Sequence, residues 1–284
     1  QQRLQVLHDN IETHFRTVAG LAKALASQPD MAQFLRQTTL PDAAQVAPES
    51  RLALQAELLS RDPVQRMNVR LEELVRWFQI RQAYIQNTQA TSVADSDQGS
   101  SSSTLGANFR HREYFLQAMS EGTGFQFVMG RISHKPGFNF SARISEDGQA
   151  LGVLILKTDP NSMQRMLIDS VGRVLAIADH NGVVVASTRA KDLLQTVPKP
   201  PRQRLSNAEI QSVYLQTPKP LPWRETTVDI RGEARPAVLI DGKRYLSLSL
   251  DMAGYPYRLW VWAPLLNESD VMTAGVLGGL LAGT

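Results

Sequence analysis

The sequence has no cysteine among its 284 residues. Disulfides, catalytic thiols and cysteine-ligated metal sites are therefore excluded. The five histidines show no metal-ligand spacing, and no phosphate loop, dinucleotide fingerprint or nucleophile-elbow motif occurs. We therefore expect no catalytic residue, no metal and no cofactor, and a hydrolytic enzyme is disfavoured although such sites need not be local in sequence.

An excess of one charge is also nearly absent. The 30 Lys and Arg exceed the 27 Asp and Glu by three, and no basic run interleaves with aromatic residues. This pattern is not typical of nucleic-acid binding, so we expect no nucleic-acid partner. The apolar fraction of 43% supports a folded core, and the length fits one large or two ordinary domains.

The two ends of the sequence indicate a fragment or a processed product. The chain begins with Gln1 rather than Met, and an uncharged, glycine-rich run covers 271–284. A spanning helix needs about 20 apolar residues, so this run is too short by itself, although its composition is typical of half a span. Its four glycines would make a poor helix in water. We therefore expect 266–284 to begin a transmembrane helix rather than a buried C-terminal helix.

The first 36 residues carry an apolar stripe at spacings of three and four, which predicts one long helix over 3–36. Polar His14 lies inside the stripe. Such a stripe packs on its own domain or forms the seam of a parallel dimer, in which His14 would help to set the register. We expect intradomain packing for the C-terminal half and dimer contact for the N-terminal half.

Helix and strand patterns then follow one another. Helices are predicted over 49–59 and 64–78, a strand-like stretch over 81–91 and a flexible polar loop over 95–106. A short helix over 112–119 precedes the next strands. The predicted strands are 125–132, 138–145, 150–157, 172–179, 183–188, 226–230, 237–240, 244–250 and 257–263.

This order predicts the fold class. A helix that starts near Pro160 separates two cycles of helix and strands, and short turns join successive strands. We therefore predict an α+β fold in which a long N-terminal helix precedes two tandem modules with antiparallel sheets.

The stretch from 108 to 159 has cationic groups at both ends, with aromatic residues between them. Arg110 and Arg112 lie at its start, and Lys157 lies near its end. If its strands form one antiparallel sheet, these ends converge on a pocket for a small anion. A guanidinium suits a carboxylate because its planar fork donates two parallel hydrogen bonds.

Three segments resemble those of a double Cache domain, the extracytoplasmic sensor module of bacterial receptors. They are 108–115 (NFRHREYF), 151–159 (LGVLILKTD) and 174–187. The likeness is greatest to C4-dicarboxylate sensor histidine kinases of the DctB type, and it covers nearly the whole chain. It implies two PAS-like modules and four segments. These are a signalling helix (1–40), a membrane-distal ligand-binding module (41–165), a membrane-proximal module (166–265) and a second transmembrane helix (266–284).

The resemblance also implies a ligand site. In the family, an arginine of the aromatic-rich motif and a lysine of a following strand meet the ligand's carboxylates. Matched motif to motif, these become Arg112 and Lys157. Tyr114, Phe140 and Ser141 become pocket wall and hydrogen-bond donors.

Other residues near these motifs are further candidates. Arg110 is an arginine additional to the family pattern, and Glu113 stands where the family often has proline. Thr158 is a candidate hydroxyl donor, but a parity error on a strand would move such a residue to the opposite face. His134 lies in a loop that could cover the pocket, although an exposed loop histidine is the ordinary interpretation. Asp159 fits a helix cap better than an ammonium ligand.

The leading hypothesis is a non-catalytic periplasmic sensor domain of an inner-membrane histidine kinase. It would bind a small organic acid, form a homodimer through its N-terminal helix and be anchored by flanking helices. A diacid is favoured by two cations, with monocarboxylates and amino acids as alternatives. Another alternative is the sensor of a diguanylate cyclase or chemoreceptor. A third is a protein-binding module with a vestigial pocket, docking through 198–222.

Overall fold

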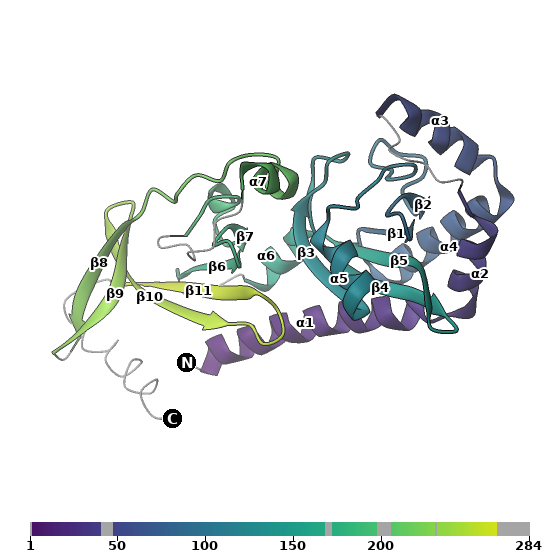
Figure 1. The fold of residues 1–284 in the computed structure, drawn as a ribbon. Helices are drawn as coiled ribbons and strands as arrows, with labels where there is room; N and C mark the ends of the chain where they lie inside the picture. The colour runs from purple at the N-terminus through teal and green to yellow at the C-terminus, as the bar shows by residue number, and fades with distance from the viewer. Residues whose placement is uncertain (1, 41–47, 168–171, 198–205, 231, 266–284) are drawn as a thin grey trace. The chain divides into compact units, whose positions relative to one another are not determined.

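The computed structural model describes residues 2–40, 48–167, 172–197, 206–230 and 232–265 (Figure 1). They fall into two compact units. We call 14–159 the Lys157 unit, and 1–13 with 160–284 the Trp262 unit. Within the described ranges, no helix is long and apolar enough to cross a membrane. The predicted transmembrane segment, 266–284, lies outside those ranges.

The N-terminal helix is shorter than predicted. Helix α1 (Gln2–Ala26) ends before Gln28, whose backbone is extended with φ −72° and ψ 137°, and α2 (Pro29–Gln37) follows. A proline disfavours helical geometry in the residue before it and suits the first turn of a new helix. The prediction of one helix over 3–36 was wrong because the apolar stripe continues through Pro29 while the helix does not.

One face of α1 is buried within the fold. The ring of Phe15 lies 5.0 Å from that of Phe125 and 5.4 Å from that of Phe138, measured between centroids. Intradomain packing of the C-terminal half of the stripe is thus confirmed, whereas the dimer seam of the N-terminal half stays a prediction. The buried apolar residues of α1 are Ile11, Phe15, Val18, Ala22, Leu25 and Ala26.

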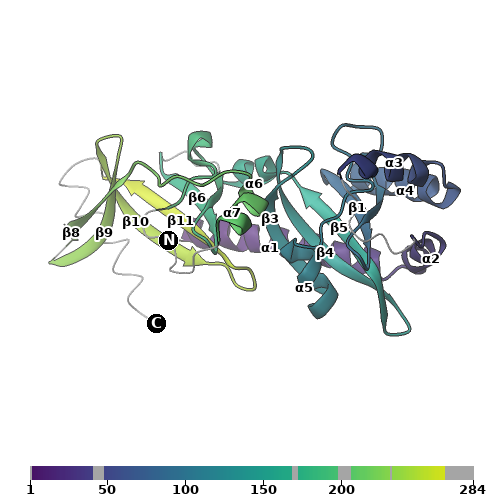
Figure 2. The same cartoon turned by 45° about the horizontal axis from the view of Figure 1, so that its top comes forward.

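The Lys157 unit is built on a five-stranded antiparallel sheet in the order β2-β1-β5-β4-β3. Helix α5 covers one face of the sheet, where its buried side chains pack on β1 and β5. Phe15 of α1 packs on the opposite face. Helix α4 packs against β1 and β2 beside α3 (Figure 2). The bounds are α3 (Pro48–Leu59), α4 (Asp62–Phe78), β1 (Gln82–Asn87), β2 (Ser92–Asp95), α5 (Glu113–Glu121), β3 (Thr123–Met129), β4 (Pro136–Glu146) and β5 (Gln149–Thr158).

The register of this sheet decides which side chains share a face. Lys157 of β5 lies opposite Gln82 of β1 and Asn139 of β4. Side chains directly opposite one another in neighbouring strands project from the same face. This row lies on the face covered by α5, and the alternate residues Phe138 and Phe140 lie on the face covered by α1.

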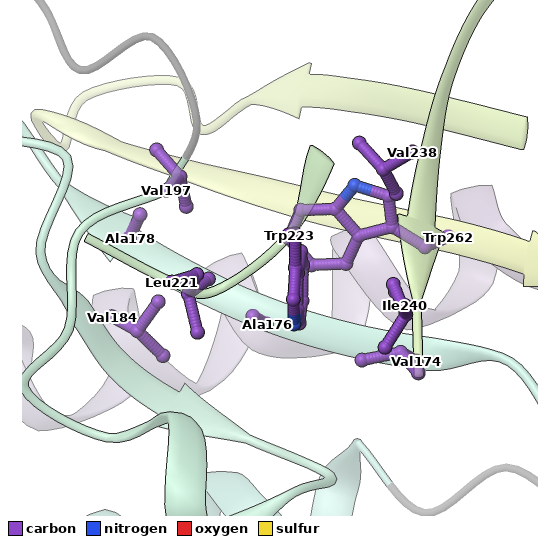
Figure 3. Packing of buried hydrophobic residues seen from close by; sticks show 10 residues of the cluster. All are labelled: Val174, Ala176, Ala178, Val184, Val197, Leu221, Trp223, Val238, Ile240 and Trp262. Atoms are coloured by element: carbon purple, nitrogen blue, oxygen red, sulfur yellow. The ribbon is translucent and has the colours of Figure 1, made fainter. Parts of the chain in front are cut away.

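The Trp262 unit has a six-stranded antiparallel sheet in the order β7-β6-β11-β10-β9-β8. Its core contains Trp223 and Trp262, whose rings meet edge to face at 4.7 Å and 82° (Figure 3). The predicted α+β class with antiparallel sheets is confirmed. The bounds are α6 (Pro160–Met166), β6 (Val174–Asp179), β7 (Val184–Ser187), the 3-10 helix η1 (Ala190–Asp192), α7 (Asn207–Tyr214), β8 (Arg224–Ile230), β9 (Glu233–Ile240), β10 (Lys243–Asp251) and β11 (Tyr257–Pro264).

Candidate functional site

A small cavity of about 30 Å³ lies in the Lys157 unit, on the face of the sheet that α5 covers. The sheet, the start of α5 and the two long connections β2–α5 and β3–β4 all contribute to it. No described residue that lines it is acidic, and three are cationic. The lining residues are Gln82, Tyr84, Ser102, Thr104, Phe109, Arg112, Tyr114, Val128, Gly130, Arg131, Ile132, Ser133, Asn139 and Lys157.

Lys157 supplies a buried ammonium group from the end of an apolar strand. Only 6% of the residue is exposed, and its Nζ donates to the carbonyl oxygen of Lys135 at 3.2 Å. Burial, reinforced by the charge of Arg81, lowers the pKa of Lys157 to about 8, although Asp97 and Asp159 act in the opposite direction. The group is therefore mostly protonated at pH 7, inside a site that opposes its charge.

Arg112 supplies a second buried cation from the residue that precedes α5. It is 4% exposed, and its Nη2 donates to the carbonyl oxygen of Met129 at 3.4 Å. Burial lowers the pKa of Arg112, but a guanidinium remains charged at neutral pH. Arg112 and Lys157 thus hold two positive charges in the wall of one cavity.

Arg131 is a third cation, and the sequence analysis did not select it. It is exposed, its guanidinium carbon lies 5.6 Å from the ring centroid of Phe109, and its Nη2 donates to the carbonyl oxygen of Asn108 at 2.9 Å. These two contacts hold Arg131 at the mouth of the cavity. Its position near the end of the predicted strand 125–132, within the stretch from 108 to 159 that carries the other cations, was the available signal.

Two phenols and an amide form the polar part of the wall. The hydroxyl of Tyr84 lies 3.1 Å from that of Tyr114 and donates to Oδ1 of Asn139 at 3.2 Å. Burial raises the pKa of both tyrosines, so they remain neutral. Neutral hydroxyl groups can donate to a carboxylate oxygen. Asn139 and Tyr84 were not predicted, whereas Tyr114 was.

Asp95 organises the connection that closes one side of the cavity. Its carboxylate accepts from Gln82 Nε2 at 3.0 Å, from Thr104 Oγ1 at 2.7 Å and from the backbone N–H of Asp97 at 2.8 Å. Burial raises the pKa of Asp95, while these hydrogen bonds act to lower it. The polar loop predicted over 95–106 begins one residue later, because Asp95 closes β2, and the buried Asp95 carboxylate ties this loop to β1.

Strand parity removes two predicted residues from the cavity wall. Phe140 lies on the opposite face, with its ring 5.5 Å from that of Phe15 and 4.7 Å from that of Phe125. Thr158 follows Lys157 directly, so it points to that same opposite face. The structure therefore places Phe140 in the packed core and Thr158 away from the candidate site.

Ser141 lies on the expected face but has a different partner. Its hydroxyl donates to the backbone carbonyl oxygen of Tyr114 at 2.7 Å and it does not line the cavity. This hydrogen bond attaches the first turn of α5 to β4. Ser141 is therefore placed to position Tyr114 rather than to contact a ligand.

The remaining two candidates are exposed and do not line the cavity. The backbone N–H of Arg110 donates to Asn108 Oδ1 at 3.2 Å, and its side chain faces solvent. His134 has a left-handed backbone with φ +50°, and its N–H donates to the carbonyl oxygen of Gly130 at 2.8 Å. His134 thus shapes the loop whose neighbouring Ile132 and Ser133 line the cavity.

Comparisons with known proteins agree with this architecture, although no family model matches the chain. The C4-dicarboxylate transport sensor protein DctB of Rhizobium meliloti (strain 1021) is 25% identical over 243 residues, 81% of this chain and 39% of the relative. The chain thus spans about two fifths of that relative. The V. cholerae histidine kinase DctB sensor domain has a TM-score of 0.70 at 19% identity, covering 94% of this chain and 97% of that one.

A chemoreceptor has the same fold at a greater distance. The ligand-binding domain of Pseudomonas fluorescens CtaA, solved with L-serine, has a TM-score of 0.55 at 12% identity, covering 92% of this chain and 93% of that one. The predicted resemblance is confirmed: the chain is similar to DctB-type sensor domains, and its two sheets form tandem Cache-like modules. L-serine is a ligand of CtaA, and C4-dicarboxylate transport belongs to the DctB proteins.

Proposed function

We propose that this chain is the extracytoplasmic ligand-sensing domain of a transmembrane sensor histidine kinase, and that its Lys157 unit binds a C4-dicarboxylate. The observation that carries the proposal is the charge of the cavity: Arg112, Lys157 and Arg131 line it, and no described lining residue is acidic. Buried cations destabilise a fold unless an anion compensates them. Charged groups held in such a cavity are therefore candidates for ligand recognition.

The number of charges favours a diacid over the alternatives. Two buried cations match two carboxylates, and the hydroxyls of Tyr84 and Tyr114 can donate to the same oxygens. An amino acid would bring an ammonium group into a cavity whose described wall offers three cations and no carboxylate. Asp159, the residue considered for an ammonium group, is not among the lining residues.

Binding requires the cations to exchange partners. At present Arg112 donates to the carbonyl of Met129 and Lys157 to that of Lys135, at either end of the connection between β3 and β4. A cavity of about 30 Å³ leaves no room for a four-carbon diacid unless side chains or this connection shift. A ligand that takes over these donors therefore favours a second arrangement of the connection.

The remainder of the proposal concerns the whole protein. The ligand-dependent arrangement would change the activity of a kinase domain on the other side of the membrane. The similarity to DctB supports this output, since the relative is more than twice as long as the chain matched to it. Homodimer formation through α1 and anchoring by flanking helices belong to the same proposal.

Calorimetry and thermal unfolding test the ligand assignment directly. The panel is succinate, malate and fumarate, with butyrate and L-serine as single-carboxylate comparisons. A diacid at about 100 times its dissociation constant should add roughly 2.7 kcal/mol of stability. Arg112→Ala should weaken diacid binding at least about 30-fold, since truncating one partner of a buried charge pair costs about 2–5 kcal/mol.

The matched control is Arg110→Ala, because Arg110 is an exposed arginine two residues away and outside the cavity wall. It should leave diacid affinity unchanged. If L-serine alone raised the unfolding temperature, and Arg112→Ala did not change its affinity, the dicarboxylate assignment would be wrong. The chain would then bind an amino acid at another site.

A further inference from the structure

Two ionisable side chains of α1 form a cluster outside the cavity, within the Trp262 unit. His8 and Glu12 lie one helical turn apart and are only 9% and 7% exposed. Nε2 of His8 lies 2.9 Å from the carbonyl oxygen of Asp251, and the backbone N–H of Ala253 donates to the Glu12 carboxylate. We call His8, Glu12, Asp251 and Ala253 the α1 clasp, because they fasten α1 to the connection between β10 and β11.

The ring of His8 faces hydrogen-bond acceptors at both of its nitrogens, which is more than a neutral imidazole can satisfy. Nδ1 of His8 lies 3.2 Å from the Asp9 carboxylate, while Nε2 lies 2.9 Å from the Asp251 carbonyl and 3.5 Å from the Glu12 carboxylate. Neutral imidazole carries one N–H, whereas imidazolium carries two. Only the protonated ring can therefore donate from both nitrogens at once.

The surrounding charges favour the same protonation state. Burial lowers the pKa of His8, but the hydrogen bond to Asp251, the hydrogen bond to Asp9 and the charge of Glu12 together raise it above 6.5. The opposing cation is Arg258 of β11, and its Nε donates to the exposed Asp251 carboxylate at 2.6 Å. Arg258 is thus paired with a carboxylate beside the clasp.

We propose that His8 is a titratable switch that makes the attachment of α1 to the β10–β11 connection depend on pH. The imidazolium donates to the Asp251 carbonyl and to the Asp9 carboxylate at once. After loss of its proton the two acceptors compete for one N–H, and the tautomer that keeps it on Nδ1 releases Asp251 and loosens the clasp. Since α1 is continuous from Gln2 to Ala26, the clasp sets how firmly one end of this helix is held. The proposal is independent of the ligand in the Lys157 unit.

The other histidine of α1, His14, is half-buried and does not have these properties. Burial lowers the pKa of His14, and its Nε2 has no hydrogen-bond partner among the described residues. The pKa values of His14 and His8 are therefore shifted in opposite directions. The pKa values of the two histidines differ because His8 faces the Asp251 carbonyl and the Asp9 and Glu12 carboxylates.

The test is an NMR titration of the imidazole resonances together with amide exchange of Ala253, both on the unmodified chain. We expect His8 to titrate above 6.5, and the intrinsic-rate-corrected exchange of Ala253 to quicken about tenfold as pH rises through that transition. Glu12→Gln should move the titration toward 6.5. His8→Gln keeps a neutral donor, so it should abolish the pH dependence without unfolding the unit.

His134→Gln is the control, because His134 is exposed and lies in the Lys157 unit. It should leave both readings unchanged. A His8 titration at or below 6.5, or an Ala253 exchange that does not follow it, would overturn the proposal without bearing on the dicarboxylate site.

Discussion

At the residue scale, the most informative group is Lys157. It buries an ammonium group at a position where an apolar side chain would give a more stable fold. Its pKa falls from 10.5 to about 8 on folding, a difference on the order of 3 kcal/mol. The folded pKa is depressed for a base, so the folded state loses stability as pH falls from 10.5 to about 8. At neutral pH this residue therefore opposes folding, as is common for functional groups held ready for a ligand.

Lys157→Met should therefore stabilise the chain and abolish diacid binding. At pH 7 we expect a gain of about 1–3 kcal/mol in the free energy of unfolding, measured by urea denaturation. This gain should shrink as pH rises from about 8 and vanish above pH 10.5, where the lysine is neutral in both states. Lys135→Met is the control, because its side chain is exposed and its effect should stay within about 0.5 kcal/mol. A loss of stability in Lys157→Met at pH 7 would show that the ammonium group supports the fold.

The same pKa predicts how diacid affinity depends on pH. The ligand binds the protonated form, so affinity should be constant below pH 7 and fall up to about tenfold per unit above pH 8. Calorimetry at several pH values measures this, and Lys157→Arg is the comparison because arginine stays protonated. An affinity that is level from pH 7 to 9.5 would mean that Lys157 does not contact the ligand.

At the element scale, the sequence predicted the order of the strands and the existence of all the described strands except β2 (Ser92–Asp95). It did not determine which face of the sheet each side chain projects from. Arg112, Tyr114 and Lys157 line the cavity, as their motifs indicated. Phe140 does not, because the period of two in a strand turns a one-residue uncertainty into the opposite face. The neighbouring residue Asn139 lines the cavity instead. Only the register of β4 against β5, which places Asn139 opposite Lys157, shows this.

Contacts between segments distant in sequence were the other limit. Asp95 holds Gln82 and Thr104 at the cavity through hydrogen bonds that no local pattern encodes. The polar composition of 95–106 indicated a flexible loop, because composition alone does not reveal the hydrogen bonds that attach a loop to a buried carboxylate. By contrast, the end of α1 had a local signal in Pro29, which the prediction of one helix over 3–36 did not use.

The start of β4 offers a prediction at this scale, because Gly137 lies so close to Lys157 that there is no space for a larger side chain. A Cβ on Gly137 would lie 2.2 Å from Cε and 2.8 Å from Cγ of Lys157. Gly137→Ala should displace the lysine, weaken diacid binding about tenfold and cost about 1–3 kcal/mol of stability. Calorimetry at a temperature where the variant is folded measures the change in affinity, and urea denaturation measures the change in stability.

Gly99→Ala is the matched control, since nothing lies within 4 Å of a Cβ at that position. It should leave affinity and stability unchanged. Unaltered diacid binding in Gly137→Ala would show that the position of the ammonium group is not critical for recognition.

At the scale of the whole molecule, the two units repeat one strand order but use it differently. In the Lys157 unit the row Gln82, Lys157, Asn139 is polar and borders the cavity. The equivalent row of the Trp262 unit is Val174, Trp262, Ser247. There the indole of Trp262 replaces the ammonium group and packs against Trp223, so side chains occupy the position of the cavity.

This difference predicts one diacid per chain. A cleft of the Trp262 unit is lined by Asp179, Asp251 and Arg258, and the guanidinium of Arg258 is already paired with the Asp251 carboxylate. Its two carboxylates disfavour a dianion there. Calorimetry should therefore give a stoichiometry of one, and Arg112→Ala should remove the whole binding signal rather than half of it. A second site that survives Arg112→Ala would mean that the tryptophan-filled module also binds the ligand. If one diacid binds per chain and Arg112→Ala removes it, the chemistry of this row, rather than the fold that the two modules share, would decide which module binds the ligand.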